Sequence, residues 1–404
     1  NELGKFLKDI TGFNHVSFQS NSGAMGEYSG LLCIKKYHET HKSERDICLI
    51  PKSAHGTNFA SAHLAGLKVE TYYDSLNMNE FEDLVKGIGD RLSCLMITYP
   101  GTNGIFQDNI KEITDCIHRY GALVYLDGAN MNALVGLVKP ADVGADVCHL
   151  NLHKTFCIPH GGGGPGMGPI LCNDKLAVHL PNNIFQSDGY HNQKHSIGMI
   201  TGSNWSSASL LSIPYQYILA SGEAGLRKHT EIAILNANYL KDRLKQYYQI
   251  VDTNKNGRVA HEFIIDVSNF KHLKINETDI AKRLMDYSFH PPTMSWPRLG
   301  VLMFEPTETE NKQELDRLVD ALISINLEIQ DIAREKNYEN NVLKNAPHSI
   351  DLITDWPHSY SMEKAFFPLP NLKENKFWPT TTRIDDIAGE ITEPFIPTTR
   401  IRQY

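Results

Sequence analysis

The chain has 404 residues, of which 41% are hydrophobic and 21% are charged, as is typical of a globular protein. Its formal net charge is −8, from 39 basic and 47 acidic residues without a basic stripe, so we expect no nucleic-acid partner. No apolar run reaches the roughly 18 residues that a membrane span needs, so we expect no membrane segment. The seven cysteines lack CxxC spacing, which predicts reduced thiols in a protein that is not secreted, with no zinc site.

The chain begins at Asn1 inside a helical pattern and without an initiator methionine, so we expect a further segment before it. From there to about residue 220, short apolar strands alternate with helical patterns, which predicts an α/β domain with a mostly parallel sheet. The predicted strands are 16–19, 47–51, 68–72, 94–98, 123–126 and 147–151. The predicted helices are 24–38, 57–65, 79–87 and 108–120. We therefore predict a large domain over residues 1–220.

Beyond residue 220 the pattern predicts a smaller α/β domain over 221–340. Its predicted elements are a helix at 223–248, a strand at 262–267, a helix at 279–287, a strand at 299–305 and a helix at 311–334. Residues 341–404 are rich in proline, asparagine and aromatic side chains. They predict an irregular C-terminal extension that covers a neighbouring surface.

The distinctive polar residues of the large domain follow the predicted strands. They are Asn21–Gly23, His55–Thr57, Pro100–Asn103, Asp127 and Lys154. In open α/β sheets the ligand lies beyond the carboxyl ends of the strands, so these residues are predicted to form one site.

Asp127 and Lys154 predict the chemistry of that site. Asp127 ends the apolar strand 123–126. Lys154 follows the strand 147–151 and precedes Phe156 and Cys157, so we expect it to be poorly placed for solvent. A lysine amine condenses with an aldehyde once it is deprotonated, and burial favours the deprotonated form. A carboxylate beside a pyridine nitrogen keeps that nitrogen protonated, so the pair suits pyridoxal phosphate (PLP). The simpler alternatives are a helix-capping aspartate and a lysine that extends to solvent.

Two further motifs fit the same cofactor. Ser22, Gly23 and Ala24 open a predicted helix, where backbone amides and a hydroxyl can bind a phosphate, although an ordinary serine N-cap is an equal alternative. His55 is surrounded by small residues that leave space for a flat ring, whereas most histidines after a strand are surface or capping residues.

Other chemistries are less well supported. His160 precedes a glycine run at 161–164, which we interpret as a loop that closes over the substrate, since one histidine without a paired ligand is weak evidence for a metal site. No G-x-S-x-G elbow and no G-x-x-x-x-G-K-[ST] loop occurs, which argues against a serine hydrolase and a nucleotide-binding protein.

Long segments of the chain resemble the C-terminal half of the glycine-cleavage P protein family, the PLP-dependent glycine decarboxylases. The resemblance is carried by residues 51–58, 125–133 and 151–169, and it continues through 233–239, 292–297, 305–308 and 376–379. It implies the fold type I architecture of PLP-dependent transferases. It also implies decarboxylation of glycine and transfer of the aminomethyl group to the lipoyl arm of the carrier H protein.

The same resemblance implies roles for individual residues. Lys154 would form the Schiff base with PLP, Asp127 would contact the pyridine nitrogen, and His55 would lie against the ring. The phosphate and ring substituents would lie among Ser22, Gly23, Ala24, Thr102, Ala129 and His153. A homologous N-terminal half, as a segment or a subunit, is implied as a partner within a homo- or hetero-oligomer. The implied compartment is the mitochondrial matrix in a eukaryote or the cytoplasm in a bacterium.

Some positions depart from the family pattern. Gly101 replaces a usual serine, Phe59 a usual proline, and Arg298–Leu299 a usual Val–Ala pair, and the stretch 171–204 also differs. Two alternatives therefore stay open: a PLP enzyme that acts on another small amino acid, and a diverged half that binds a partner without catalysis.

Overall fold

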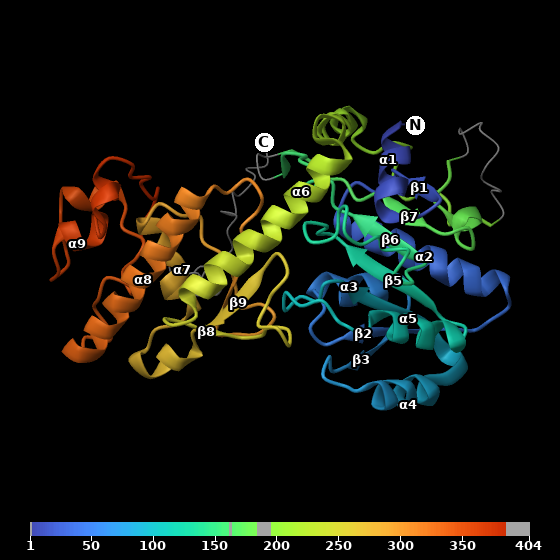
Figure 1. The fold of residues 1–404 in the computed structure, drawn as a ribbon, viewed down its shortest axis with the longest axis horizontal. Coiled ribbons are helices and arrows are strands. Elements are labelled where there is room, and N and C mark those ends of the chain that lie inside the picture. The colour runs from blue at the N-terminus through green and yellow to red at the C-terminus, as the bar shows by residue number, and fades with distance from the viewer. Residues whose placement is uncertain (1, 161–163, 184–194, 385–404) are drawn as a thin grey trace, which may run out of the picture. The chain divides into compact units, whose positions relative to one another are not determined.

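The computed structural model describes residues 2–160, 164–183 and 195–384 (Figure 1). The chain forms two compact units. The first comprises Asn1–Lys241, Ile250–Ile264 and Glu305–Asn311, and the second comprises Asp242–Gln249, Ile265–Phe304 and the chain from Lys312 onward. All of the predicted site residues therefore belong to the first unit.

A seven-stranded sheet forms the centre of the first unit, in the order β1-β7-β6-β5-β4-β2-β3. The pairs among β3, β2, β4, β5 and β6 are parallel, whereas β7 and β1 pair antiparallel at one edge. This confirms the predicted mostly parallel sheet. The strands are β1 (His15–Ser17), β2 (Ile47–Pro51), β3 (Lys68–Tyr72), β4 (Leu92–Thr98), β5 (Leu123–Gly128), β6 (Val147–Leu150) and β7 (Ile170–Cys172).

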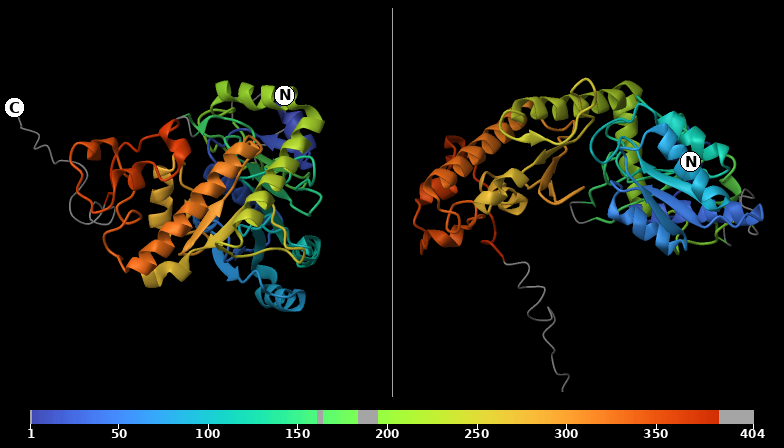
Figure 2. Two further views of the ribbon diagram at one scale, coloured as in Figure 1. Left: turned by 60° about the vertical axis from the view of Figure 1, so that its left-hand side comes forward. Right: turned by 90° about the horizontal axis from the view of Figure 1, so that it is seen from below.

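Helices cover both faces of this sheet. They are α1 (Glu2–Thr11), α2 (Gly23–Thr40), α3 (Gly56–Leu64), α4 (Met78–Ile88), α5 (Ile110–Arg119) and α6 (Ser212–Leu244). Short 3-10 turns lie at Gly89–Arg91, Ala177–His179 and Ala208–Leu211. The helix α6 changes direction at Gly222, where φ is 61° (Figure 2). The predicted domain boundary at 220 falls inside this helix, and the three-part division stays a prediction.

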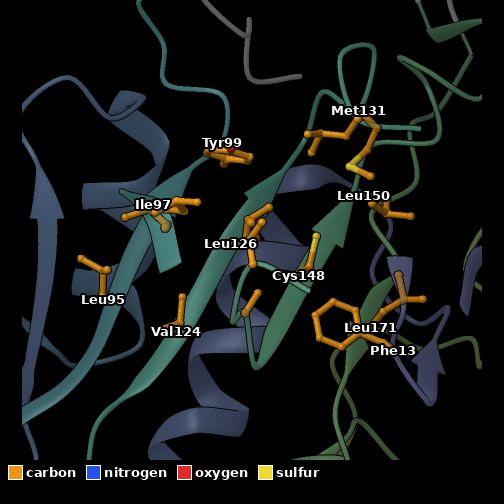
Figure 3. Close-up of a cluster of buried hydrophobic side chains, with 14 of the residues drawn as sticks. Phe13, Leu95, Ile97, Tyr99, Val124, Leu126, Met131, Cys148, Leu150 and Leu171 are labelled. Carbon is orange, nitrogen blue, oxygen red and sulfur yellow. The ribbon is translucent and has the colours of Figure 1, made fainter. Parts of the chain in front are cut away.

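Alternate side chains of the central strands enter two separate cores. Leu95, Ile97, Val124 and Leu126 point to one face of the sheet, in a core that also contains residues of α1, α4 and α5 (Figure 3). Met96 and Tyr125 point to the other face, where the core includes residues of α2 and α3. Because both faces are covered, β4 and β5 are almost entirely buried, which explains their continuous apolar sequences.

A second, four-stranded sheet has the order β10-β11-β9-β8. Its strands are β8 (Gln249–Ile250), β9 (Phe263–Asp266), β10 (Thr293–Met294) and β11 (Val301–Phe304). The later helices are α7 (Glu277–Asp286), α8 (Lys312–Glu335) and α9 (Met362–Phe366), with 3-10 turns at Ser268–Leu273, Ile350–Ile353 and Pro370–Lys373. In the described part of the chain, no helix is both long enough and apolar enough to span a membrane.

Candidate active site

The parallel strands place Asp127 and the segment that carries Lys154 at the same edge of the sheet. Asp127 is aligned with Thr98 of β4 on one side and with His149 of β6 on the other. Lys154 follows β6 in a turn in which its amide donates to the carbonyl of Asn151 at 3.0 Å. The loop after β5 is tied to this turn, because the amide of Met131 donates to Thr155 Oγ1 at 3.0 Å.

Asp127 is a buried carboxylate that the surrounding groups keep ionised. Its side chain accepts hydrogen bonds from Asn58 Nδ2 at 2.9 Å and from the amide of Ala129 at 2.9 Å, and His149 Nε2 lies 3.5 Å away. Burial by itself raises the pKa of Asp127. The nearby His149, the two hydrogen bonds and the charge of Lys154 outweigh burial and hold the pKa below its usual value. The site therefore contains a permanent anion close to Lys154.

Lys154 itself is exposed, so the expectation that it would be poorly placed for solvent is wrong. The turn after β6 directs the neighbouring Leu152 and Phe156 into the core instead, and both are fully buried. The charge of Lys154 nevertheless acts on the groups around it, since it lowers the pKa of Asp127, His153 and Glu262. The two residues on which the PLP prediction depends thus lie close enough to interact.

A second layer of polar residues supports Asp127, and the sequence did not indicate it. The hydroxyl of Tyr125 lies 2.9 Å from His149 Nδ1, and burial holds the pKa of Tyr125 well above its usual value. Glu27 of α2 accepts hydrogen bonds from Thr57 Oγ1 at 2.8 Å and Ser61 Oγ at 2.7 Å. Burial is the main cause of the raised pKa of Glu27, and nearby Asp127 adds to it. Tyr125 and Asp127 are two residues apart on β5, a spacing that already places them on one face.

The first residues of α2 pack tightly against the turn that carries Lys154. Ser22 is the N-cap, and its Oγ accepts a hydrogen bond from the amide of Met25 at 3.2 Å. A Cβ atom at Gly23 would clash with the side-chain amide of Asn151, so only glycine allows this approach. The serine cap that the sequence analysis gave as an alternative is therefore present. The amides of Gly23 and Ala24 come before that of Met25, at the start of α2, where a helix provides no carbonyl partner of its own.

The other predicted residues make contacts within the protein. His55 caps α3, where its Nδ1 accepts from the amide of Thr57 at 3.2 Å, so the capping alternative is observed as well. Thr102 Oγ1 donates to the carbonyl of Ser53 at 2.7 Å, which links the loop after β4 to the loop after β2. The His153 ring accepts from the amide of Met167 at 3.3 Å, and burial is the main cause of its pKa being lowered to about 4.

The residues around Asp127 fit a polar aromatic ligand with a phosphate group. Several buried polar atoms have no hydrogen-bond partner among residues 2–160, 164–183 and 195–384, and those of this site include Asn58 Oδ1, His149 Nε2 and Asn151 Oδ1. Buried polar groups without a partner are rare and often mark a ligand position. Together with the anionic Asp127, the exposed Lys154 amine and the start of α2, they provide the donors and acceptors that PLP needs. Residues 161–163 of the glycine run and 184–194 of the divergent stretch lie outside the described residues.

Solved structures with this fold include a glycine decarboxylase and an enzyme crystallised with PLP. The chain is similar to the crystal structure of glycine decarboxylase (P-protein) in inhibitor-bound form, with a TM-score of 0.62 and 18% identity over 80% of this chain and 74% of that chain. It is also similar to rice TDC with PLP and tryptamine, with a TM-score of 0.61 and 12% identity over 81% of this chain and 75% of that chain. The fold is therefore that of the fold type I, PLP-dependent enzymes.

Sequence relatives narrow this class to one family. Residues 229–348 match the family model described as "Glycine dehydrogenase, C-terminal domain". Glycine dehydrogenase (decarboxylating) of Psychrobacter arcticus is 52% identical over 399 residues, which are 96% of this chain and 41% of that protein. The mitochondrial human protein of that name is 51% identical over 399 residues, 96% of this chain and 39% of that protein. The chain belongs to the glycine dehydrogenase (decarboxylating) family, and it spans about two fifths of the length of these relatives.

Proposed function

We propose that this chain forms the PLP-binding part of a glycine decarboxylase that passes the aminomethyl group of glycine to the lipoyl arm of H protein. The observation that carries the proposal is that the buried, ionised Asp127 and the turn that carries Lys154 lie at the same carboxyl edge of a fold type I sheet. The family membership supports glycine as the substrate. The remaining length of the relatives supports a homologous N-terminal half as a partner, as a segment or a subunit.

Individual residues would contribute as follows. Lys154 would hold the cofactor aldehyde, and Asp127 would keep a proton on the pyridine nitrogen. The amides of Gly23 and Ala24, with Ser22, would bind the phosphate at the start of α2. His55 would lie against the ring, and Thr102, Ala129 and His153 would line the site. When PLP is bound, it supplies an electron sink for the bond between the Cα and the carboxyl group of glycine.

The protein's own contribution is alignment and charge. Asn58, Ala129 and His149 hold the Asp127 carboxylate in one orientation, so the anion is fixed before any ligand arrives. Such preorganisation lowers the barrier because no dipoles need to turn during the reaction. A compartment follows from the same family: the mitochondrial matrix in a eukaryote or the cytoplasm in a bacterium.

The test is a visible spectrum of the complete protein with PLP and then with glycine. We expect a visible absorbance band with PLP, and we expect Lys154→Ala to lose both this band and the decarboxylation of glycine while its circular dichroism stays unchanged. Lys5→Ala, an exposed lysine of α1, is the matched control and should behave like the wild type. Full turnover by Lys154→Ala would refute the proposal.

A second measurement separates the two alternatives. Labelled bicarbonate enters the carboxyl group of glycine only if the protein makes and breaks that carbon–carbon bond. Exchange therefore supports glycine decarboxylation, whereas an absorbance change with another amino acid and no exchange would indicate a different PLP reaction. A protein with no PLP band at all would be a non-catalytic partner half.

A further inference from the structure

Three residues that the proposed function does not use converge within the first unit: His261, Glu262 and Glu305. One nitrogen or oxygen atom from each lies within 4.8 Å of the other two. His261 Nε2 is 3.9 Å from Glu262 Oε2 and 3.7 Å from Glu305 Oε1, too far for direct hydrogen bonds. His261 is only 3% exposed, and neither ring nitrogen has a hydrogen-bond partner in the described part of the chain. His261 is therefore a buried polar side chain without a partner, whereas Glu262 is half-buried and Glu305 is exposed.

The cluster is built against the loops that follow β4 and β5. Glu305 Oε1 accepts hydrogen bonds from Asn130 Nδ2 at 2.6 Å and Asn132 Nδ2 at 2.8 Å, just beyond Asp127. The amide of Ala260 donates to the carbonyl of Gly104 at 2.7 Å. Gly104 has a φ of +76°, and a Cβ atom there would clash with the carbonyl of Glu262. The same two loops carry Thr102 and Ala129, so the cluster borders the candidate active site.

Lys154 connects the cluster to that site electrostatically. The charge of Lys154 lowers the pKa of both His261 and Glu262. For Glu262 this effect is outweighed, because burial and the neighbouring Glu305 raise its pKa to about 8. Burial is also the main cause of the lowered pKa of His261. These shifts favour an uncharged imidazole on His261 and a protonated carboxylic acid on Glu262 at neutral pH.

One histidine and two glutamates could also bind a divalent metal ion. The hydrogen bonding argues against it. Both amide donors of Asn130 and Asn132 point to the same oxygen of Glu305, the one nearest to His261, so its lone pairs are already used. The positive charge of Lys154 close by opposes a second cation. A stored proton fits these surroundings better.

We propose that Glu262, which lies in a cluster with His261 and Glu305, is the proton donor to the sulfur that leaves when the aminomethyl group is transferred. The inference rests on the proposed function. The electron pair that remains on the glycine carbon after loss of CO2 forms a bond to one sulfur of the lipoyl disulfide. The sulfur–sulfur bond breaks, and its electron pair leaves on the second sulfur as a thiolate. Glu262 protonates that thiolate and becomes a carboxylate, so the disulfide is reduced and the proton is accounted for.

The first test needs neither PLP nor turnover. Infrared spectra of the PLP-free complete protein, recorded between pH 6 and 10, should contain the carbonyl band of a protonated carboxylic acid that disappears with a midpoint near 8. Glu262→Gln should lack this titration, and Glu82→Gln, at an exposed glutamate paired with Arg119, should retain it. Glu305→Gln keeps an acceptor oxygen for Asn130 and Asn132 but removes a charge, so it should move the midpoint to lower pH. A spectrum without any such band would overturn the proposal.

The second test separates the proton step from decarboxylation. Glu262→Gln should reduce transfer of the aminomethyl group to lipoylated H protein by about 10²–10⁴-fold, as expected for loss of a general acid. Exchange of labelled bicarbonate into glycine precedes the proton step and should stay within about threefold of wild type. Equal loss of exchange and transfer would refute the assignment of Glu262, whereas absence of exchange in the wild type would refute the proposed function itself. Binding of Zn²⁺ that Glu262→Gln abolishes would show a metal site and overturn the proton role.

Discussion

The hydrogen bond from Asn58 to Asp127 offers a direct test of how the site anion is held. Asn58 is fully buried, and its Nδ2 donates to Asp127 Oδ2 at 2.9 Å. Asn58→Leu keeps the shape of the side chain and removes the donor. A hydrogen bond to a charged group contributes about 1.5–3 kcal/mol, so we expect the free energy of unfolding to fall by that amount at neutral pH. The Asn58 Oδ1 atom has no partner in the described structure, so the loss is confined to the Nδ2 bond.

The loss of stability in Asn58→Leu should depend on pH, because it involves the ionised form of Asp127. The pKa of Asp127 in the folded protein lies below its usual value, so the ionised form stabilises the fold above that usual value and this contribution is lost as pH falls through the lowered pKa. Asn58→Leu should raise the pKa of Asp127. The difference in stability between the variant and the wild type should therefore be largest near neutral pH and should shrink as the pH falls toward the lowered pKa of Asp127.

The assay is urea denaturation of the PLP-free protein, followed by circular dichroism, from neutral pH to the lowest pH at which it folds. Thr114→Val is the matched control, because it removes a buried hydrogen bond of 2.9 Å to a neutral carbonyl, that of Val143. The control should lose about 1 kcal/mol at every pH. If Asn58→Leu loses no more than Thr114→Val, or the same amount at every pH, then Asn58 does not stabilise an ionised Asp127.

Two further predictions concern packing and buried charge. Gly23→Ala should weaken PLP binding and lower the melting temperature, because its methyl group would clash with Asn151 and displace the start of α2. Gly56→Ala is the control. No atom lies within 4 Å of its added carbon, so it should be close to wild type in both measurements. Arg283→Met should destabilise the second unit by about 3–5 kcal/mol in urea denaturation, because it leaves Asp286 and Glu328 buried without the guanidinium that binds both. Arg91→Met, in an exposed pair with Asp46, should leave the unfolding midpoint nearly unchanged, and equal losses in the two arginine variants would contradict the reasoning.

Elements with a clear strand or helix pattern in a local stretch of sequence could be predicted well. The strands at 47–51 and 68–72 coincide with β2 and β3, and the helix predicted at 311–334 coincides with α8 within a residue at each end. The antiparallel edge was not predicted, because β7 has only three residues and its pairing with β1 joins segments far apart in the chain. The predicted start of α6 was about eleven residues late, since the sequence before Gly222 lacks a clear helical period.

In the candidate site, too, contacts between segments far apart in the chain could not be predicted. Asp127 and Lys154 could be proposed from their places after apolar strands, and the geometry brings their segments together. His149 could not be assigned, because its approach to Asp127 depends on the register of β5 and β6. Glu305 lies 175 positions from Asn130, the residue that binds it, and no local pattern records such a contact. The exposure of Lys154 was missed because the turn after β6 buries its neighbours instead.

The first unit is not one continuous stretch of chain, since the backbone leaves it after Lys241 and re-enters it at Ile250 and again at Glu305. A fragment that ends at Lys241 would keep Asp127 and Lys154 but would lack Glu262 and Glu305. Shortening the gene from its 3′ end to a point before Asn311 therefore removes part of the first unit, and a version that keeps the whole unit has to extend through Asn311. Insertions within Asp242–Gln249 or Ile265–Phe304, the two segments that lie outside the first unit, should disturb that unit less, because they leave all three of its segments intact.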